Sequence, residues 1–337
     1  MIFPTIAAFE QALDTLPDPD AAAIADARAR QAQLTKPAGS LARLEEISIF
    51  FAGWQGRERP RIDQGRAVVF AGNHGVTTHG ISAFPPAVTA QMVANFEAGG
   101  AAINALAAAA GLDLKVVAIE LDRPTADFTT APAMDEADCL AALSIGAAAV
   151  DPGIDLLVLG EMGIGNSTAA AALAARSFGG DAADWVGPGT GVDGEGILRK
   201  RTVVDRALAF HADAPRSAFE TLRRVGGREI AAIAGAVLRA RQLSVPVILD
   251  GFICCSGVAP LAAFAPGITA HCLAGHVSAE PGHGRLLDRL GLDPLLRLGM
   301  RLGEGSGAAV AAALIRSALA AHGEMATFAE AGVSAAG

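Results

Sequence analysis

The feature that most constrains the fold is residues 154–178, where an apolar run leads through a glycine-rich turn into an alanine-rich segment. The run at 156–159, LLVL, is typical of a buried strand. The turn that follows, GEMGIG at 160–165, contains three glycines, and the alanine-rich segment begins at Ser167. This order predicts a strand, a tight turn and the N-terminus of a helix.

The predicted turn suits a phosphate group. Backbone N–H groups at a helix N-terminus are unpaired and carry partial positive charge, and glycines let the backbone approach an anion closely. A carboxylate, Glu161, stands at the end of the strand beside this expected anion site. Because a carboxylate repels phosphate, its presence indicates a role in catalysis or in an oriented hydrogen bond.

Other segments repeat the alternation of strand and helix. Strands are predicted over 66–72, 113–121, 154–160 and 245–257, and at the start of 268–291, whose remainder is predicted to be a loop. Alternating strands and helices form parallel sheets with right-handed crossovers. We therefore predict an α/β fold, with a parallel Rossmann-like sheet flanked by helices.

The ends of the chain are poor in strands and predict a second, smaller part. Residues 61–299 are assigned to a large α/β domain that carries the substrate loops. Residues 1–60 together with 300–337 are assigned to a small helical domain, which contains Glu304. Residues 1–35 are expected to be helical and to lie at the surface.

The composition excludes several classes of function. A net charge of −9 and a pI near 5.3 argue against binding to nucleic acid or to an anionic membrane. The mean hydropathy of +0.39 reflects mostly alanine, and no charge-free run predicts a membrane span. The four cysteines lack CxxC spacing, and the N-terminus lacks a secretory signal pattern. These features predict a cytoplasmic protein with reduced thiols.

A long loop follows the strand at 66–72 and holds His74 and His79. Loops after the strands of α/β proteins commonly carry ligand contacts. No third residue stands at a recognised metal-binding spacing from the two histidines, so a hydrogen-bonding role for these loop residues is favoured over a metal site. We predict no metal and no cofactor.

Two more features resemble the turn at 160–165. Glycines at 187–196, followed by Lys200, predict a second wall for a phosphate. Glu304 lies in GEGSG ahead of an alanine-rich helix, so two glutamates stand in glycine-rich turns. Small neighbours leave room for a ligand, and burial raises the pKa of a carboxylate toward useful base strength. The serine of GEGSG is misplaced for a G-x-S-x-G nucleophile, which argues against a serine hydrolase.

Eight motifs occur in one order over residues 36–309: KPAGSLARLE, AGNHGV, GISAFPPAVTAQMVANFEAGGAAIN, GEMGIGNST, GPGTGVD, DGFI, HVSAEPGH and MRLGEGSGAA. Together they closely resemble the nicotinate-nucleotide–dimethylbenzimidazole phosphoribosyltransferase family of the cobalamin pathway. The resemblance covers nearly the whole chain. It has three departures, which are Ala42 in place of glycine, Ser167 in place of threonine and Val277 in place of arginine.

The resemblance implies transfer of phosphoribose from nicotinate mononucleotide to 5,6-dimethylbenzimidazole, giving α-ribazole 5′-phosphate and nicotinate. The departing ring nitrogen becomes neutral and needs no proton. The incoming benzimidazole still carries an N–H, so it needs a general base, and Glu304 is the candidate that matches the family. Glu161 is then expected to position the ribose or to stabilise oxocarbenium charge.

The remaining site residues follow from loop position and resemblance together. The phosphate and ribose are expected to contact Gly163, Gly165, Asn166, Ser167, Thr168, Gly189, Thr190, Gly191 and Lys200. The flat apolar base pocket is expected to be lined by Ser82, Phe84, Pro85, Gln91 and Leu302. The implied partners are small-molecule substrates and a second copy of the chain in a homodimer.

Two other functions remain open at this point. One is a nucleotide- or base-binding module that has lost catalysis, although such a module would not need Glu304. The other is a dinucleotide-dependent oxidoreductase. Gly163-x-Gly165 lacks the third glycine of the dinucleotide fingerprint, because position 168 is threonine, so that match is weak.

Overall fold

The computed structural model describes residues 2–189 and 191–334. Its centre is a parallel sheet with the strand order β2-β1-β3-β4-β5-β6. The strands are β1 (Gly65–Ala71), β2 (Asp113–Ala118), β3 (Leu156–Met162), β4 (Val247–Leu249), β5 (Cys272–His276) and β6 (Pro294–Leu296). The prediction of an α/β fold built on a parallel Rossmann-like sheet is confirmed.

Helices flank the sheet and extend below it. The α-helices are α1 (Ile6–Asp14), α2 (Ala21–Gln33), α3 (Arg43–Gln55), α4 (Ala87–Glu97), α5 (Ala102–Ala109), α6 (Glu136–Ala148), α7 (Asn166–Phe178), α8 (Ala182–Trp185), α9 (Gly194–Phe210), α10 (Ala218–Val225), α11 (Arg228–Gln242), α12 (Phe252–Phe264), α13 (Pro281–Leu290), α14 (Ser306–Glu324) and α15 (Phe328–Ala331). Two 3₁₀ turns, η1 (Gly75–His79) and η2 (Pro266–His271), complete the described elements.

The period-2 alternation of the strands separates two hydrophobic cores. Phe70 and Leu159 belong to the larger core, which α6, α7, α10, α11 and α12 cover, whereas their chain neighbours Val69 and Val158 belong to the smaller core on the opposite face. Successive strand residues point to opposite faces, so a sheet covered on both sides reads as a continuous apolar run. This explains why the strands β1 and β3 lack a polar face.

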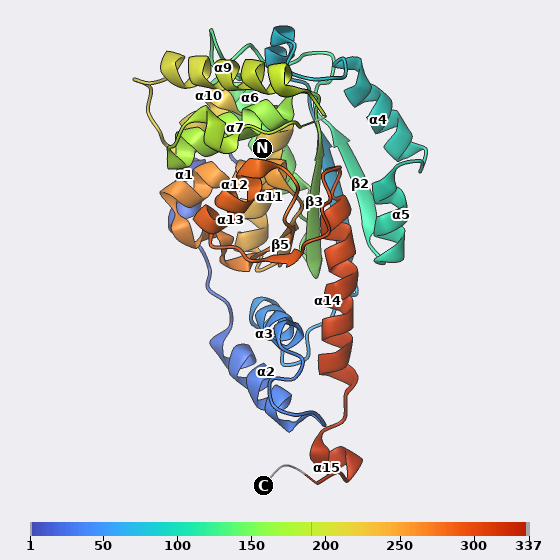
Figure 1. The fold of residues 1–337 in the computed structure, drawn as a ribbon. Helices are drawn as coiled ribbons and strands as arrows, with labels where there is room; N and C mark the ends of the chain where they lie inside the picture. The colour runs from blue at the N-terminus through green and yellow to red at the C-terminus, as the bar shows by residue number, and fades with distance from the viewer. Residues whose placement is uncertain (1, 190, 335–337) are drawn as a thin grey trace.

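The long helix α14 joins the sheet to the lower part of the molecule. Its upper half packs against β3, β4 and β5, and its lower half packs against α3, which in turn contacts α2 (Figure 1). The division into 61–299 and the two chain ends stays a prediction.

The helix α1 packs with the larger core. The ring of Phe9 lies 6.3 Å from that of Phe219 in α10, and Phe9 and Leu13 are buried. The other residues of α1 are exposed or partly exposed, so the expectation that residues 1–35 are helical and lie at the surface holds for this helix, which buries one face.

Two predicted element boundaries are wrong. In 245–257, only Val247–Leu249 is strand, because Asp250–Gly251 ends it and α12 begins at Phe252. In 268–291, the predicted loop contains α13, which starts with Pro281 at its first position, where the missing N–H of proline has no consequence. The helix α12 is buried on nearly all sides, so its apolar pattern does not distinguish helix from strand.

Within 2–189 and 191–334, none of the helices combines the length and the apolar character that a membrane crossing requires.

Candidate active site

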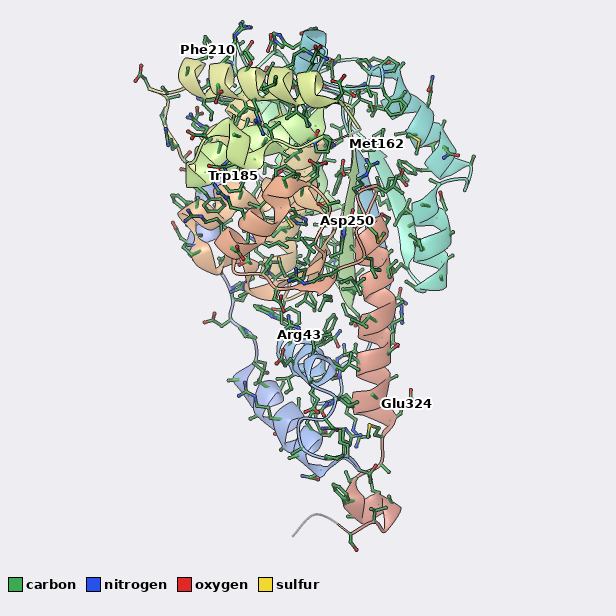
Figure 2. All side chains as sticks on the ribbon, in the orientation of Figure 1. Arg43, Met162, Trp185, Phe210, Asp250 and Glu324 are labelled. Atoms are coloured by element: carbon green, nitrogen blue, oxygen red, sulfur yellow. The ribbon has the colours of Figure 1, made fainter. Side chains whose placement is uncertain are left out.

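A cavity of about 260 Å³ opens at the carboxyl ends of the parallel strands, where open α/β sheets bind ligands. It lies among the ends of β3 and β5, the N-termini of α7 and α12, and the segment that precedes α14. In Figure 2, Met162 and Asp250 are labelled in this upper body, and Glu324 marks the lower end of α14. The cavity is lined by Phe84, Glu161, Met162, Gly163, Ile164, Asn166, Ser167, Gly189, Gly251, Phe252, Ile253, His276, Ser278, Glu280, Arg301, Leu302 and Gly303.

Glu161 lies near the end of β3 and is only 6% exposed. The side-chain amide of Asn166, the first residue of α7, donates a hydrogen bond to its Oε2 atom. Burial raises the pKa of Glu161 to about 8, and the charges of Asp250, Glu229 and Glu304 add to the effect, which the Asn166 hydrogen bond opposes. The strand–turn–helix order predicted from residues 154–178 is therefore present, with a protonatable carboxyl group at its centre.

Glu304 lies in a strained turn directly ahead of α14. Gly303, Glu304 and Gly305 have φ angles of 85°, 63° and 86°, a conformation that only the two glycines adopt readily. Burial raises the pKa of Glu304, and hydrogen bonding from the Ile103 backbone opposes this. Its Oε2 atom is buried and has no hydrogen-bond partner among residues 2–189 and 191–334. Glu304 does not line the cavity, although its neighbours at 302 and 303 do.

The two glutamate turns touch each other directly. A Cβ atom on Gly160 would lie 2.5 Å from the backbone of Glu304, and one on Gly303 would lie 2.6 Å from Oε1 of Glu161. Position 160 therefore requires glycine for close approach of the backbones, and position 303 requires it because of its positive φ. This contact brings together two motifs that are more than a hundred residues apart in the sequence.

Asp250, at the end of β4, holds the Glu304 turn from below. Its carboxylate oxygens accept hydrogen bonds from the backbone N–H groups of Gly305, at 3.2 Å, and Ala308, at 2.9 Å. Burial raises the pKa of Asp250 to about 7, and those hydrogen bonds limit the rise. Nε2 of His276 lies 3.5 Å from Oδ1 of Asp250. Asp250 of the motif DGFI thus fixes the backbone of the turn in the motif GEGSG through hydrogen bonds.

The glycine loop at 187–189 is held by two buried charged groups. Nζ of Lys200 donates to the carbonyl oxygen of Gly187, at 2.7 Å, and to Oγ of Ser167, at 3.0 Å. The N–H of Gly189 donates to Oε1 of Glu280, at 2.9 Å. Burial lowers the pKa of Lys200 to about 8. The lysine therefore contacts the walls of the expected phosphate site and does not itself line the cavity.

The predicted site residues fall into three groups. Those that line the cavity are Glu161, Gly163, Asn166, Ser167, Gly189, Phe84 and Leu302. Those that lie outside its lining are Glu304, Gly165, Thr168, Gly191, Lys200, Ser82, Pro85 and Gln91. Thr190 lies outside the described residues. Their roles in binding stay predictions.

Sequence reasoning missed several lining residues: Gly251, Phe252, Ile253, His276, Ser278, Glu280 and Arg301. Most of them lie in the motifs DGFI and HVSAEPGH, for which the sequence predicts no ligand contact. The departure at Val277 lies beside this group, and its side chain packs against the larger core. Hydrogen bonding of the loop histidines is confirmed, because His74 contacts Glu229 and His79 contacts Asp127.

The chain is similar to known proteins over nearly its whole length. The family model described as phosphoribosyltransferase matches residues 16–333. A protein of Novosphingobium aromaticivorans named nicotinate-nucleotide–dimethylbenzimidazole phosphoribosyltransferase is 71% identical over 98% of both chains. A protein of the same name from Ruegeria pomeroyi is 59% identical over 98% of this chain and 97% of its own.

A solved structure agrees with these relatives. The crystal structure of CobT from Thermus thermophilus superimposes with a TM-score of 0.87 at 43% identity, and it covers 94% of this chain and 100% of that one. The matched region includes both glutamate turns, since the family model extends from residue 16 to residue 333. The chain therefore belongs to the nicotinate-nucleotide–dimethylbenzimidazole phosphoribosyltransferase family, as its eight motifs predicted.

Proposed function

We propose that this protein transfers phosphoribose from nicotinate mononucleotide to 5,6-dimethylbenzimidazole, giving α-ribazole 5′-phosphate and nicotinate. Membership of the family and the names of its relatives support the reaction. The cavity supports it as well, because glycine-rich backbone on one side and apolar residues on the other suit a phosphate and a flat base.

Glu304 acts as the general base in this proposal. One nitrogen of the incoming benzimidazole attacks C1′ of the ribose, and the other must lose its proton for the product to stay neutral. The observation that carries this role is the Oε2 atom of Glu304, which is buried, finds no donor among the described residues and belongs to a turn whose residues 302 and 303 line the cavity. A buried oxygen is costly to leave unpaired, so Oε2 is ready to accept a hydrogen bond from the N–H of the incoming benzimidazole. A raised pKa further strengthens it as a base.

Glu161 acts on the ribose. The carboxyl group lines the cavity at the end of β3, and Asn166 orients it. The departing nicotinate ring and the sugar both carry positive character in the transition state, which favours the ionised form of a carboxyl group beside them. Attack on the ribose face opposite nicotinate converts the β-nucleotide into an α-product.

The phosphate binds between the N-terminus of α7 and the loop at 187–191. The N-terminal end of a thirteen-residue helix and the hydroxyl of Ser167 supply donors on one side. On the other side, the Gly189 N–H is occupied by Glu280, so we expect the phosphate to displace that carboxylate. Lys200 keeps the loop in place through the carbonyl oxygen of Gly187 and adds positive charge.

The test is nicotinate release from nicotinate mononucleotide and 5,6-dimethylbenzimidazole, compared between the native chain and Glu304→Gln. Loss of one positioned base is expected to lower kcat by about 10²–10⁴-fold. Glu58→Gln is the control, because this residue lies in a turn remote from the cavity lining and is expected to leave kcat unchanged.

Two outcomes contradict the proposal in different ways. A native chain that binds both substrates in calorimetry but releases no nicotinate is a binding module without catalysis. If Glu304→Gln has native turnover, the proposed reaction stands but Glu304 is not its general base. The homodimer and the cytoplasmic location that the resemblance implies stay predictions.

A further inference from the structure

A buried histidine–glutamate pair packs beside the site and has no part in the proposed chemistry. Nε2 of His74 lies 2.6 Å from Oε1 of Glu229, and both side chains are 0% exposed. His74 follows β1, and Glu229 is the second residue of α11. Taking a carboxylate and an imidazole out of water is costly even when they are paired, so the pair is not explained as a surface contact.

Three glycines surround the pair and leave the space that it fills. A Cβ atom on Gly72 would lie 2.6 Å from Oε2 of Glu229, and one on Gly163 would lie 2.9 Å from its Oε1. A Cβ atom on Gly227 would lie 2.2 Å from Cε1 of His74. The pair therefore packs directly against the turn after β3 and against the end of β1.

The contacts continue from the pair to Glu161. The carbonyl oxygen of Gly163 accepts the N–H of Asn166 at 3.1 Å, and the amide of Asn166 donates to Glu161. On the other side, the N–H of Gly72 donates to the carbonyl oxygen of Met162 at 3.0 Å. The residues that follow Glu161, from Met162 to Asn166, are therefore held by groups that pack on the pair.

A second histidine–carboxylate pair in the same loop provides a contrast. Nε2 of His79 lies 2.8 Å from Oδ2 of Asp127, but these side chains are 24% and 25% exposed. Both bond to Thr129 or its backbone, away from the residues that line the cavity. A partly exposed pair is thus enough to hold a loop of this kind. The complete burial of His74 and Glu229 therefore needs another explanation, which we seek in the residues that they contact.

We infer that His74 and Glu229 are positioning residues, which hold the Gly163 turn and thereby set the orientation of Glu161. The inference rests on the role proposed above for Glu161. The negative charge of Glu229 also contributes to the raised pKa of Glu161, so the pair affects Glu161 through charge as well as through packing.

The test compares Glu229→Gln and His74→Gln with the matched controls Asp127→Asn and His79→Gln. Displacement of a positioned group by about 1 Å lowers turnover by roughly 10²-fold, so we expect kcat to fall about 10–100-fold in the first two variants with KM nearly unchanged. In Glu229→Gln, loss of a negative charge lowers the pKa of Glu161, and the pH profile of kcat/KM moves to lower pH. The controls keep native kcat and the native profile.

Several results would overturn the inference. One is a folded Glu229→Gln variant with native kcat and an unmoved pH profile; another is an equal loss in Asp127→Asn. A measurement on the native chain covers the case in which the variants do not fold. Saturating nicotinate mononucleotide is expected to shift the imidazole nitrogen resonances of His74 and not those of His79, and an unmoved His74 overturns the inference.

Glu161→Gln separates this inference from the proposed function. If the native chain releases no nicotinate, the proposed reaction is wrong. If Glu161→Gln keeps native activity, the role of Glu161 is wrong. If Glu161→Gln loses activity while folded Glu229→Gln retains it, only the positioning role of the pair is wrong.

Discussion

At the level of single residues, Ala42 and Glu304 both have a positive φ angle, which is unusual for residues other than glycine. Glu304, at φ 63°, lies in a turn with two glycines that hold its carboxyl group beside the site, where strain is commonly retained for function. Ala42, at φ 43° and ψ −115°, precedes α3 and supplies no side-chain cap. It stands where the family resemblance predicts glycine, so its strain has no evident catalytic use.

Ala42→Gly is therefore expected to stabilise the protein. Glycine adopts positive φ without the Cβ clash, and relief of such a clash is worth about 1 kcal/mol or slightly more in the free energy of unfolding. Denaturant unfolding measures the change. The control is Ala25→Gly in the exposed middle of α2, where the same substitution is expected to destabilise by about 1 kcal/mol. If Ala42→Gly and Ala25→Gly destabilise the protein equally, the backbone of Ala42 is not strained.

At the level of elements, the site depends on the close packing of the end of β3 against the turn before α14. Gly160 allows this contact, and Asp250 at the end of β4 fixes the other side of the same turn. Two strand ends thus hold the turn that carries Glu304. The long helix α14 behind that turn packs on β3, β4 and β5, which makes the turn a part of the core rather than a surface loop.

Gly160→Ala is expected to separate these two elements. The new Cβ would meet backbone atoms of Glu304 at 2.5 Å, and backbone cannot move aside as the end of a side chain can. Overpacking of this kind costs about 1–3 kcal/mol or more. We expect a lower melting temperature and a lower kcat in the fraction that folds.

Gly284→Ala is the matched control for that substitution. Gly284 lies in α13, and no heavy atom is within 4 Å of its added Cβ. Alanine is favoured over glycine in a helix by about 1 kcal/mol, so this variant is expected to be more stable with native kcat. A Gly160→Ala variant that behaves like Gly284→Ala would show that the two turns do not need their close contact.

At the level of the whole molecule, the site concentrates buried acidic groups at one end of the sheet. Glu161 and Asp250 have pKa values of about 8 and about 7, against ordinary values of 4.5 and 3.8. At pH values between the ordinary and the native pKa of each group, the native state therefore binds more protons than the unfolded state. By linkage, stability conferred by the protonated forms is present at low pH and is lost as pH rises through the native pKa values.

We therefore expect the free energy of unfolding to fall between pH 5 and pH 7, by up to about 1.4 kcal/mol per pH unit for each group. Denaturant unfolding across this range measures the slope. Glu161→Gln is expected to make the decline shallower and to raise the melting temperature at pH 8 while removing activity. A native slope that Glu161→Gln leaves unchanged contradicts the assignment of the raised pKa to this residue.

The sequence by itself determined the architecture and the family. Local pattern is enough for β1, β2 and β3, because each is a short apolar run bounded by turn residues. It is also enough for the helix at Asn166, whose glycine turn is a local signal. It failed at α12, whose nearly complete burial removes the periodicity on which a helix prediction depends, and at α13, where Pro281 was not used as a start signal.

Only the tertiary structure decided how the motifs meet. The contact of Gly160 with Glu304, the support of that turn by Asp250 and the burial of His74 with Glu229 all join residues that are distant in the chain. The order of strands in the sheet brings these residues to one edge, and the absence of a few Cβ atoms allows them to touch. A linear pattern records which residues are present, whereas distance, burial and hence pKa depend on the packed arrangement of several elements.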